Sequence, residues 1–507
     1  MKLVLRERLY VPEELVTDDI IAHFTYQFAE REIERDANGK PIGVGKNFQT
    51  VKTVMKIRNP NDDKYYYGFA RGNLPKLKEY FGDFEWEDRT VSPKMVGNLQ
   101  FRKDRHLKNF DKDGVGQEEV VAQVLQNPNG VIKAAPRFGK TVCTVYIATK
   151  LRLKTLIIAH QHDLLRQFYQ EFIDFTNLAE IKQPQINKQD ARGQVVGFFS
   201  DYKNPEELDV CLLCWQTLGS KLGPQRIAKH RDTWGIIISD EVHKLGASKY
   251  ASVINRLNSK HRLGLTGTLK RVDDREKIVL DIVGPVIAKG KVNQVPCAVT
   301  VIHTGTNVKY DMVEPLVYLH KRLYNNQERL KTVLKYLAED VRDGFFICIG
   351  FHRSSQEQLQ EFTDVLKFLG YKAEAFYGSM KRNREEVLQE FRDGNIQIAV
   401  CNEAMLTGIN VPRWNVYYSM FPTSSVAWDV NDDGTMELSG NFKQNADRVR
   451  TPFWYTATIK KKVALIRDFV DNNKHCKNAY RKRLRAYKHQ KFEIEHIYEN
   501  IKENICG

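Results

Sequence analysis

One segment of the sequence carries the residue types needed to hold a nucleoside triphosphate. Residues 131–141 begin with an apolar run, typical of a buried strand, and end in Gly-Lys-Thr at the start of a helix pattern. Triphosphates are held by backbone N–H groups, a helix N-terminus, an ammonium group and a hydroxyl for Mg²⁺. Ala134 stands where the usual G-x-x-x-x-G-K-T pattern has its first glycine. The expected triphosphate-binding residues of this loop are Arg137, Phe138, Gly139, Lys140 and Thr141.

A second segment ends an apolar run in two adjacent acids. Residues 234–243 read Trp-Gly-Ile-Ile-Ile-Ser-Asp-Glu-Val-His. Asp240 at the end of a strand can hold Mg²⁺ through water, and Glu241 can polarise the attacking water. An acidic helix N-terminus after a strand would give the same pattern. Because Gly-Lys-Thr follows an earlier predicted strand of the same lobe, the sequence favours hydrolysis, with Thr141 and Asp240 as the metal-binding residues.

These residues need a scaffold of parallel strands that end at one edge. Short apolar runs alternate with helical patterns in two stretches, which predicts two α/β lobes with buried parallel sheets. The predicted strands of the first lobe are 131–135, 155–159, 195–199, 210–215, 235–239 and 263–266. Those of the second lobe are 298–303, 345–351, 373–377, 396–401, 416–420 and 454–459.

The chain divides into four predicted regions. Residues 1–112 form a small accessory domain, residues 113–290 the first lobe, residues 298–470 the second lobe, and residues 471–507 a helical, basic C-terminal extension. The predicted fold class is therefore α/β, with two tandem parallel-sheet lobes.

Charge and cysteine usage indicate the kind of partner and compartment. The 507 residues carry a formal net charge of +15, which favours a polyanionic partner such as nucleic acid. The sequence has no apolar run of about 18 residues and no signal-peptide core, so we expect a cytoplasmic protein without a membrane span. Cys211 and Cys214 have the spacing of half a zinc site, but no second pair accompanies them. We interpret them as strand core in a reduced protein.

The run Asp-Glu-Val-His at 240–243 resembles a DExH box. With the other motifs in the family's order, residues 115–470 resemble a superfamily 2 helicase of the XPB-like and RecG-like branch. This resemblance implies two RecA-like lobes, ATP and Mg²⁺ as cofactors, and ATP hydrolysis coupled to nucleic-acid unwinding. It also implies that Gln117 reads adenine. The residues that would couple hydrolysis to movement are His243, Thr266 and Thr268.

Several shorter segments resemble the family's nucleic-acid contacts. Residues 155–167 resemble motif Ia, and residues 214–217, Cys-Trp-Gln-Thr, resemble the W-Q-T segment. In the second lobe, residues 345–353 resemble motif IV and residues 399–412 resemble motif V, in which Gly408 permits a tight turn near the nucleotide. The nucleic-acid-binding residues implied by these matches are His160, Gln216, Thr217, Phe351, His352 and Asn402.

The resemblance also implies positive charge late in the second lobe. Hydrolysis in such motors needs an arginine finger on the γ-phosphate. The candidate is Gln444-Asn-Ala-Asp-Arg-Val-Arg450, which departs from the family's Q-x-x-G-R-x-x-R pattern. Asp447 replaces the glycine, and the second arginine comes one residue early. We predict Gln444, Arg448 and Arg450 as catalytic residues and leave open which arginine touches the γ-phosphate; the alternative is a solvated helix face.

The two ends of the chain indicate the substrate. Residues 64–81 interleave basic and aromatic residues, as phosphate clamps and base-stacking platforms do, although an aromatic core would look similar. The layout resembles that of branch-migration helicases of tailed phages, which favours DNA and branched structures such as forks and Holliday junctions. It also implies a monomer in the host cytoplasm. The basic tail either contacts phosphate or caps the second lobe.

Three alternatives to a DNA helicase remain. The first is a DExH-type RNA helicase, and the second is a translocase that moves on double-stranded DNA without unwinding it. The third is a DNA-binding scaffold with a degenerate ATP site, which Ala134 and Asp447 keep open.

Overall fold

The computed structural model describes most of the chain, and its described residues form two compact units. Residues 1–30 and 47–292 belong to the first unit, and residues 31–46 and 293–507 to the second. The description leaves out residues 1, 36–40, 61, 109–115, 136–137, 182–188, 219–222, 247, 270–273, 292–293, 312–313, 352–354, 378–379, 381–382, 403–410, 424–425, 431–435, 440–445, 454, 457–458 and 500–507. None of the described helices has the length and apolar character needed to cross a lipid bilayer.

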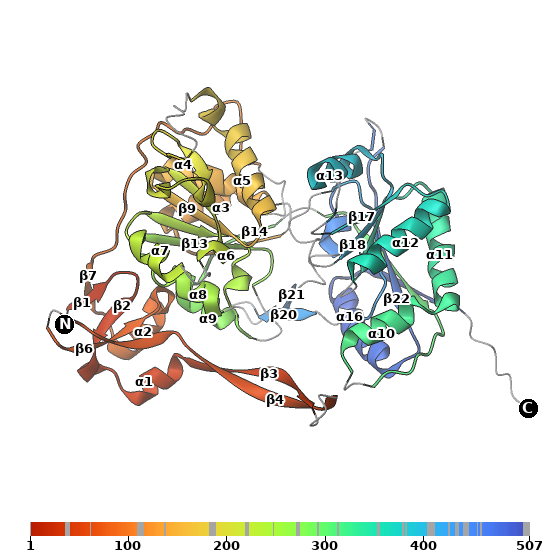
Figure 1. Ribbon diagram of the computed structural model, residues 1–507, viewed down its shortest axis with the longest axis horizontal. Coiled ribbons are helices and arrows are strands. Elements are labelled where there is room, and N and C mark those ends of the chain that lie inside the picture. Colours follow the sequence, from red (N-terminus) through yellow and green to blue (C-terminus); the bar gives the residue numbers. More distant parts are fainter. Residues whose placement is uncertain are drawn as a thin grey trace, which may run out of the picture. The chain divides into compact units, whose positions relative to one another are not determined.

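The N-terminal part of the first unit is a small mixed sheet with two short helices (Figure 1). The strand order is β5-β6-β2-β1-β7, in which only the pairing of β1 with β7 is parallel. A separate two-stranded ribbon, β3 with β4, interrupts this sheet in the sequence. The elements are β1 (Lys2–Leu5), β2 (Leu9–Pro12), α1 (Asp18–His23), β3 (Thr25–Arg35), β4 (Pro41–Lys52), β5 (Val54–Arg58), β6 (Tyr65–Phe69), α2 (Leu74–Phe81) and β7 (Glu85–Asp88).

The rest of the first unit is the first predicted lobe. Its seven strands are all parallel, in the order β10-β11-β9-β12-β13-β8-β14. The strands are β8 (Asn129–Ala134), β9 (Thr155–Ala159), β10 (Val196–Phe198), β11 (Val210–Cys214), β12 (Ile236–Ser239), β13 (His261–Thr266) and β14 (Val286–Gly290). The helices are α3 (Gln117–Gln126), α4 (Lys140–Leu151), α5 (His162–Phe175), α6 (Trp215–Leu218), α7 (Gly223–Lys229), α8 (Ser248–Ile254) and α9 (Glu276–Val283).

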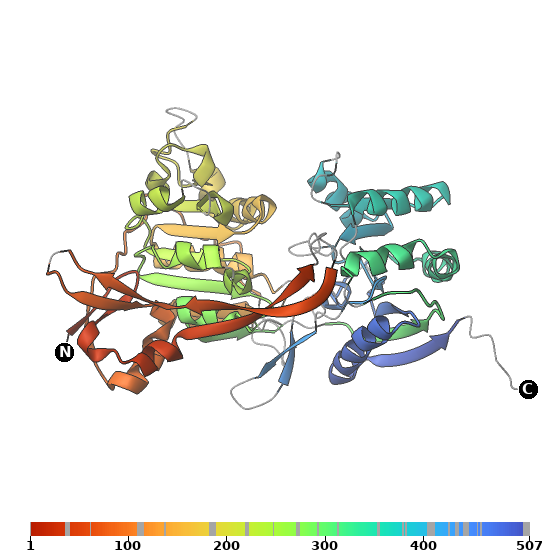
Figure 2. The ribbon, with the colours of Figure 1, turned by 60° about the horizontal axis from the view of Figure 1, so that its bottom comes forward.

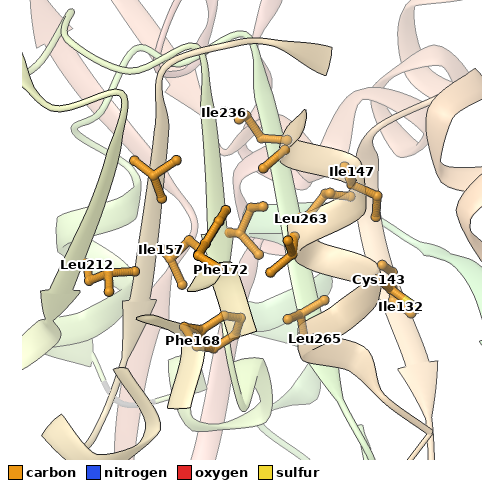
Figure 3. Close-up of a cluster of buried hydrophobic side chains, with 14 of the residues drawn as sticks. Ile132, Cys143, Ile147, Ile157, Phe168, Phe172, Leu212, Ile236, Leu263 and Leu265 are labelled. Atoms are coloured by element: carbon orange, nitrogen blue, oxygen red, sulfur yellow. The ribbon is translucent and has the colours of Figure 1, made fainter. Parts of the chain in front are cut away.

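The central strands of this sheet contain long apolar runs because helices cover both faces. Along β9, Ile157 packs into one hydrophobic cluster, whereas its neighbours Leu156 and Ile158 pack into another. Successive side chains of a strand point to opposite faces, so a continuous apolar run needs two cores. Figure 3 shows the cluster between the strands and the helices α4 and α5, which contribute Ile147 and Phe172 to it.

The second unit contains the second predicted lobe, again with seven parallel strands. Their order is β17-β18-β16-β19-β22-β15-β23. The residues of this lobe are coloured from green to blue in Figure 2. The strands are β15 (Cys297–His303), β16 (Ile347–Phe351), β17 (Ala373–Phe376), β18 (Ile398–Asn402), β19 (Val416–Ser419), β22 (Ala464–Val470) and β23 (Glu493–Tyr498). The helices are α10 (Leu316–Tyr324), α11 (Gln327–Arg342), α12 (Gln356–Phe368), α13 (Arg384–Asp393) and α16 (Lys474–His489), and a hairpin joins β20 (Ala427–Val430) to β21 (Met436–Ser439).

One predicted strand of the second lobe is wrong. Tyr455 and Thr456, inside the predicted strand 454–459, lie in a bend, and the sheet strand is β22 instead. The expected helical tail is present as α16, but the chain then returns to the sheet as β23, parallel to β15. The C-terminal extension therefore belongs to the second lobe through at least residue 498.

The small N-terminal sheet is fixed to the first lobe through a buried carboxylate. Asp281 of α9 is fully buried and accepts hydrogen bonds from the Tyr26 hydroxyl at 2.8 Å and the Thr53 hydroxyl at 2.7 Å. The Lys76 ammonium donates to the same carboxylate at 2.7 Å. Arg71 is also buried and donates to main-chain carbonyls just before β13. A buried charge is tolerated only with such partners, so these contacts hold the two parts in one arrangement.

Candidate active site at the edge of the first sheet

The triphosphate loop connects β8 to α4, as the sequence predicts. Gly139 has a φ of 86°, in the left-handed region, and α4 begins at Lys140. The Lys140 ammonium donates to the carbonyls of Ala134 at 3.0 Å and Ala135 at 3.4 Å. Ala134 is the last residue of β8 and does not need a positive φ, so alanine is compatible with this position. Arg137 lies outside the described residues.

Gln117, at the start of α3, is hydrogen-bonded to this loop through its side chain. Its side chain is 3% exposed, and its amide nitrogen donates to the Phe138 carbonyl at 2.6 Å. Its amide oxygen accepts from the Lys108 backbone N–H at 2.7 Å. A Cβ atom added at Gly139 would lie 2.2 Å from the Gln117 amide nitrogen, so glycine also serves this close approach. The predicted adenine contact of Gln117 would have to replace these bonds.

The two acids follow β12 at the same edge of the sheet. Strand β12 lies between β9 and β13, and β13 pairs with β8, so the loops after β8 and β12 emerge on one side. Burial and the adjacent Glu241 raise the pKa of Asp240. Burial also opposes ionisation of Glu241, but His243 and the charges of Lys140 and Lys244 outweigh it and lower its pKa. The Lys140 charge therefore acts on both carboxyls.

His243 connects the acids to the segment after β13. Its Nδ1 lies 3.2 Å from the Glu241 carboxylate and 3.0 Å from the Thr266 hydroxyl. The Thr266 hydroxyl donates to the Thr268 carbonyl at 2.6 Å and accepts from the Thr268 backbone N–H at 3.1 Å. Glu241 has a φ of 47°, which is unusual for a residue with a side chain and fits a constrained turn. The three predicted coupling residues are thus brought together beside Glu241.

Lys244 is a site residue that the sequence reasoning missed. Its ammonium lies 2.5 Å from His160 Nε2, and burial together with this charge lowers the pKa of His160 to about 4. The Gln216 side chain donates to the His160 carbonyl at 2.9 Å and accepts from the Cys214 thiol at 2.8 Å. The motif Ia and W-Q-T segments therefore join the acids in one network, with Thr217 next in α6. In the sequence, Lys244 looked like any surface lysine after the box.

The motif IV and V residues of the second unit are placed differently from one another. Phe351 is fully buried, and its ring packs against Phe362 at 5.2 Å and Phe421 at 5.4 Å between ring centres. Its prediction as a nucleic-acid contact is therefore wrong for the side chain, because an apolar strand end was mistaken for an exposed one. Asn402 is half-buried at the end of β18. His352 and Gly408 lie outside the described residues.

The two arginines of the last motif follow Gln444, which is also outside the described residues. Arg450 donates to the Asp447 carboxylate and to the Val295 carbonyl, each at 3.3 Å, and lies 5.0 Å from the Phe492 ring centre. Arg450 is thus engaged inside its own unit, and its assignment as a γ-phosphate residue stays a prediction. The two departures from the family pattern, Asp447 and the early arginine, form one ion pair. Arg448 is 4% exposed, and its assignment stays a prediction as well.

The basic and the aromatic residues of the N-terminal part lie in different environments. Arg71 and Lys76 hold that part to the first lobe, as described above. Tyr65, Tyr80 and Trp86 keep about two fifths of their surface exposed (44%, 41% and 36%). Exposed aromatic rings on a rigid support are suited to base stacking.

Two helicase domains match the chain over its two lobes. Residues 113–271 match the family described as type III restriction enzyme, res subunit, and residues 328–450 match the helicase conserved C-terminal domain. With the two parallel sheets, these matches identify the chain's motor domains as those of a superfamily 2 helicase, and each lobe as RecA-like.

The relatives of this chain include two that are named as DNA enzymes and one that is named as an RNA helicase. The putative ATP-dependent RNA helicase L396 of Acanthamoeba polyphaga mimivirus is 26% identical over 44% of this chain and 37% of its own length. The DNA 3'-5' translocase XPB2 of Sulfurisphaera tokodaii is 24% identical over 69% of this chain and 83% of its own length. The putative DNA 3'-5' helicase Rad25 of Haloarcula marismortui is 24% identical over 58% of this chain and 45% of its own length. The chain thus spans less than half of two of these relatives.

Proposed function

We propose that the chain is an ATP-dependent DNA helicase or translocase that remodels branched DNA, such as forks and Holliday junctions, as a monomer. The observation that carries the ATPase assignment is the edge of the first sheet, where the Lys140 charge acts on two adjacent, half-buried carboxyls. The names of the archaeal relatives support DNA as the substrate.

The donor atoms at this edge fit Mg²⁺. Asp240 is a half-buried carboxyl whose ionisation is opposed by loss of solvent and by Glu241, and a cation beside it would relieve that cost. Carboxylate and hydroxyl oxygens are the ligands that Mg²⁺ prefers, and Asp240 with Thr141 would hold it. The bound ion would supply positive charge to the β- and γ-phosphates.

Three of the chain's own residues would have separate roles in ATP hydrolysis. Lys140, which now donates to two loop carbonyls, would exchange them for phosphate oxygens. Glu241 is ionised because His243 and two lysines lower its pKa, so it can accept a proton from water. Arg448 would supply the charge from the second unit.

Nucleic-acid contacts would come from the residues that Lys244 connects to Glu241. His160 and Gln216 are bonded to each other, and His160 is 2.5 Å from Lys244. A strand that displaces or tightens these bonds would alter the charges around Glu241. We propose that this is how nucleic acid stimulates ATP hydrolysis, with Thr217 and Asn402 as further backbone contacts.

The deciding experiment compares ATP hydrolysis across single-stranded DNA, forked DNA, a Holliday junction and duplex RNA. We expect the strongest stimulation by branched DNA, and Lys140→Ala should abolish turnover while leaving the thermal unfolding midpoint unchanged. Turnover in Lys140→Ala would overturn the triphosphate site, and its absence in the wild type would favour the scaffold alternative. The salt concentration of each assay is specified, because phosphate contacts dominate the affinity for nucleic acid.

An RNA helicase is the second candidate, supported by the name of the viral relative. Stimulation by duplex RNA above that by forked DNA would select it. A duplex translocase would instead displace a third strand from a triplex without separating a fork.

A further inference from the structure

Helix α16 of the second unit presents a face of cations to solvent. The helix is 16 residues long, and its buried residues include Cys476, Ala479, Arg483 and Tyr487. Six of its eight exposed positions are lysines or arginines, and the helix contains no acidic residue. We call these six the α16 stripe: Lys474, Lys477, Arg481, Lys482, Arg485 and Lys488.

The buried face fixes the direction in which the stripe points. The Arg483 guanidinium donates to both oxygens of Asp468 on β22, at 2.9 and 2.8 Å, and to the Thr423 carbonyl at 2.7 Å. The Tyr487 hydroxyl also donates to Asp468 at 2.8 Å. Because these groups are buried, rotating α16 would break a buried ion pair, so the stripe stays on the outside.

The described residues do not neutralise the stripe. None of its six residues makes an ion pair with a carboxylate in the part of the chain that the structure describes. Neighbouring helices differ, since Lys331 pairs with Glu328 on α11 and Arg392 pairs with Glu385 on α13. Like charges three or four residues apart destabilise a helix by about 0.2–0.5 kcal/mol per pair, and Lys474 also opposes the helix dipole. Helix stability alone therefore does not explain the pattern.

We propose that the α16 stripe binds the phosphate backbone of a double helix, in addition to the strand held by the motor lobes. This inference rests on the proposed function. With a rise of about 1.5 Å per residue, the stripe extends over about 21 Å from Lys474 to Lys488. Apart from the adjacent Arg481 and Lys482, its cations follow one another along the axis at about 4–6 Å. No Phe, Tyr or Trp occupies an exposed position on α16. Single-stranded sites use aromatic stacking, whereas a duplex offers only its charged backbone to such a surface.

The test removes four charges from the stripe without reversing them. The variant is Lys477→Gln, Arg481→Gln, Lys482→Gln and Arg485→Gln together. The control removes four exposed charges elsewhere in the same unit, by Lys321→Gln, Lys331→Gln, Lys367→Gln and Lys372→Gln. Binding of labelled 30-base-pair DNA and RNA duplexes and of a 30-nucleotide single strand is measured by fluorescence anisotropy at several salt concentrations, without ATP.

We expect the stripe variant to lose about tenfold or more in duplex affinity at 0.1 M salt, and its salt slope to fall by about 3–4. The control should change less than about threefold, because its charges would lie outside the contact. Equal weakening in both variants, an unchanged slope, or an equal loss for the single strand would overturn the inference. If the fourfold variant fails to fold, the pairs Lys477→Gln/Arg481→Gln and Lys482→Gln/Arg485→Gln should each give half of the slope change, and unchanged slopes in both would overturn it.

The same measurements separate this inference from the proposed function. A wild-type chain that binds the duplex but shows no nucleic-acid-stimulated ATP hydrolysis would refute the motor and leave the stripe standing. A stripe variant with intact duplex binding and normal single-strand-stimulated turnover would refute the stripe alone. Matching losses for DNA and RNA duplexes are expected from backbone contacts, and a loss limited to one of them would contradict a purely backbone site.

Discussion

Replacing Arg450 by alanine separates structural from catalytic arginines in the last motif. Arg450 contacts Asp447, the Val295 carbonyl and the Phe492 ring, all inside the second unit. We therefore expect Arg450→Ala to lower stability and to spare turnover at a permissive temperature. Arg448→Ala should instead lower kcat by about 10³-fold or more, as for an arginine finger.

The expected loss of stability follows from the buried ion pair. The side chains of Arg450 and Asp447 are 13% and 2% exposed, and the single contact between them is 3.3 Å long. Removing one member of a buried pair costs about 3–5 kcal/mol, and a single long bond places this pair at the lower end. The cation–π contact with Phe492 adds about 0.5–1 kcal/mol. We expect a total of about 3–4 kcal/mol for Arg450→Ala.

The assay is thermal unfolding of the single variants, of Asp447→Ala and of the double variant. Two units need not unfold as one, so the transition of the second unit is followed by hydrogen exchange of β15 and β23. The double variant should be less destabilised than the sum of the singles, because neither residue is left buried without the other. An Arg450→Ala chain with wild-type unfolding and lost turnover would refute the structural role.

Three further perturbations act elsewhere in the first unit. Because His243 lowers the pKa of Glu241, His243→Ala should raise that pKa and move the acid limb of the rate–pH profile to higher pH; an unmoved limb would contradict the contact. Asp281→Ala leaves three donors without their buried acceptor and should cost about 3–5 kcal/mol in thermal unfolding, whereas a loss below about 1 kcal/mol would mean that the N-terminal sheet is loosely attached. Gly139→Ala should raise the KM for ATP, because its φ is 86° and its Cβ would meet Gln117, whereas an unchanged KM would contradict the close approach.

Local patterns were sufficient for most of the fold and for the position of the loop between β8 and α4. The strand at Thr155–Ala159 lies where the sequence predicts it, because a run of apolar residues without charges fits a sheet buried on both faces. Gly139 and Lys140 lie at the start of a helix after a strand, since glycine at a left-handed position and the following periodicity are both local signals. These features depend only on neighbouring residues, which the sequence displays directly.

Only the tertiary structure decided how charges are buried. The charged residues Arg467 and Asp468 make strand β22 look like a surface segment in the sequence. In the structure, Asp340 of α11 neutralises Arg467, and Arg483 of α16 neutralises Asp468. The same is true of Lys244, which becomes part of the site only because His160 meets it across the sheet edge. A charged residue can be interior or exposed according to partners far away in the sequence, and folding alone brings those partners together.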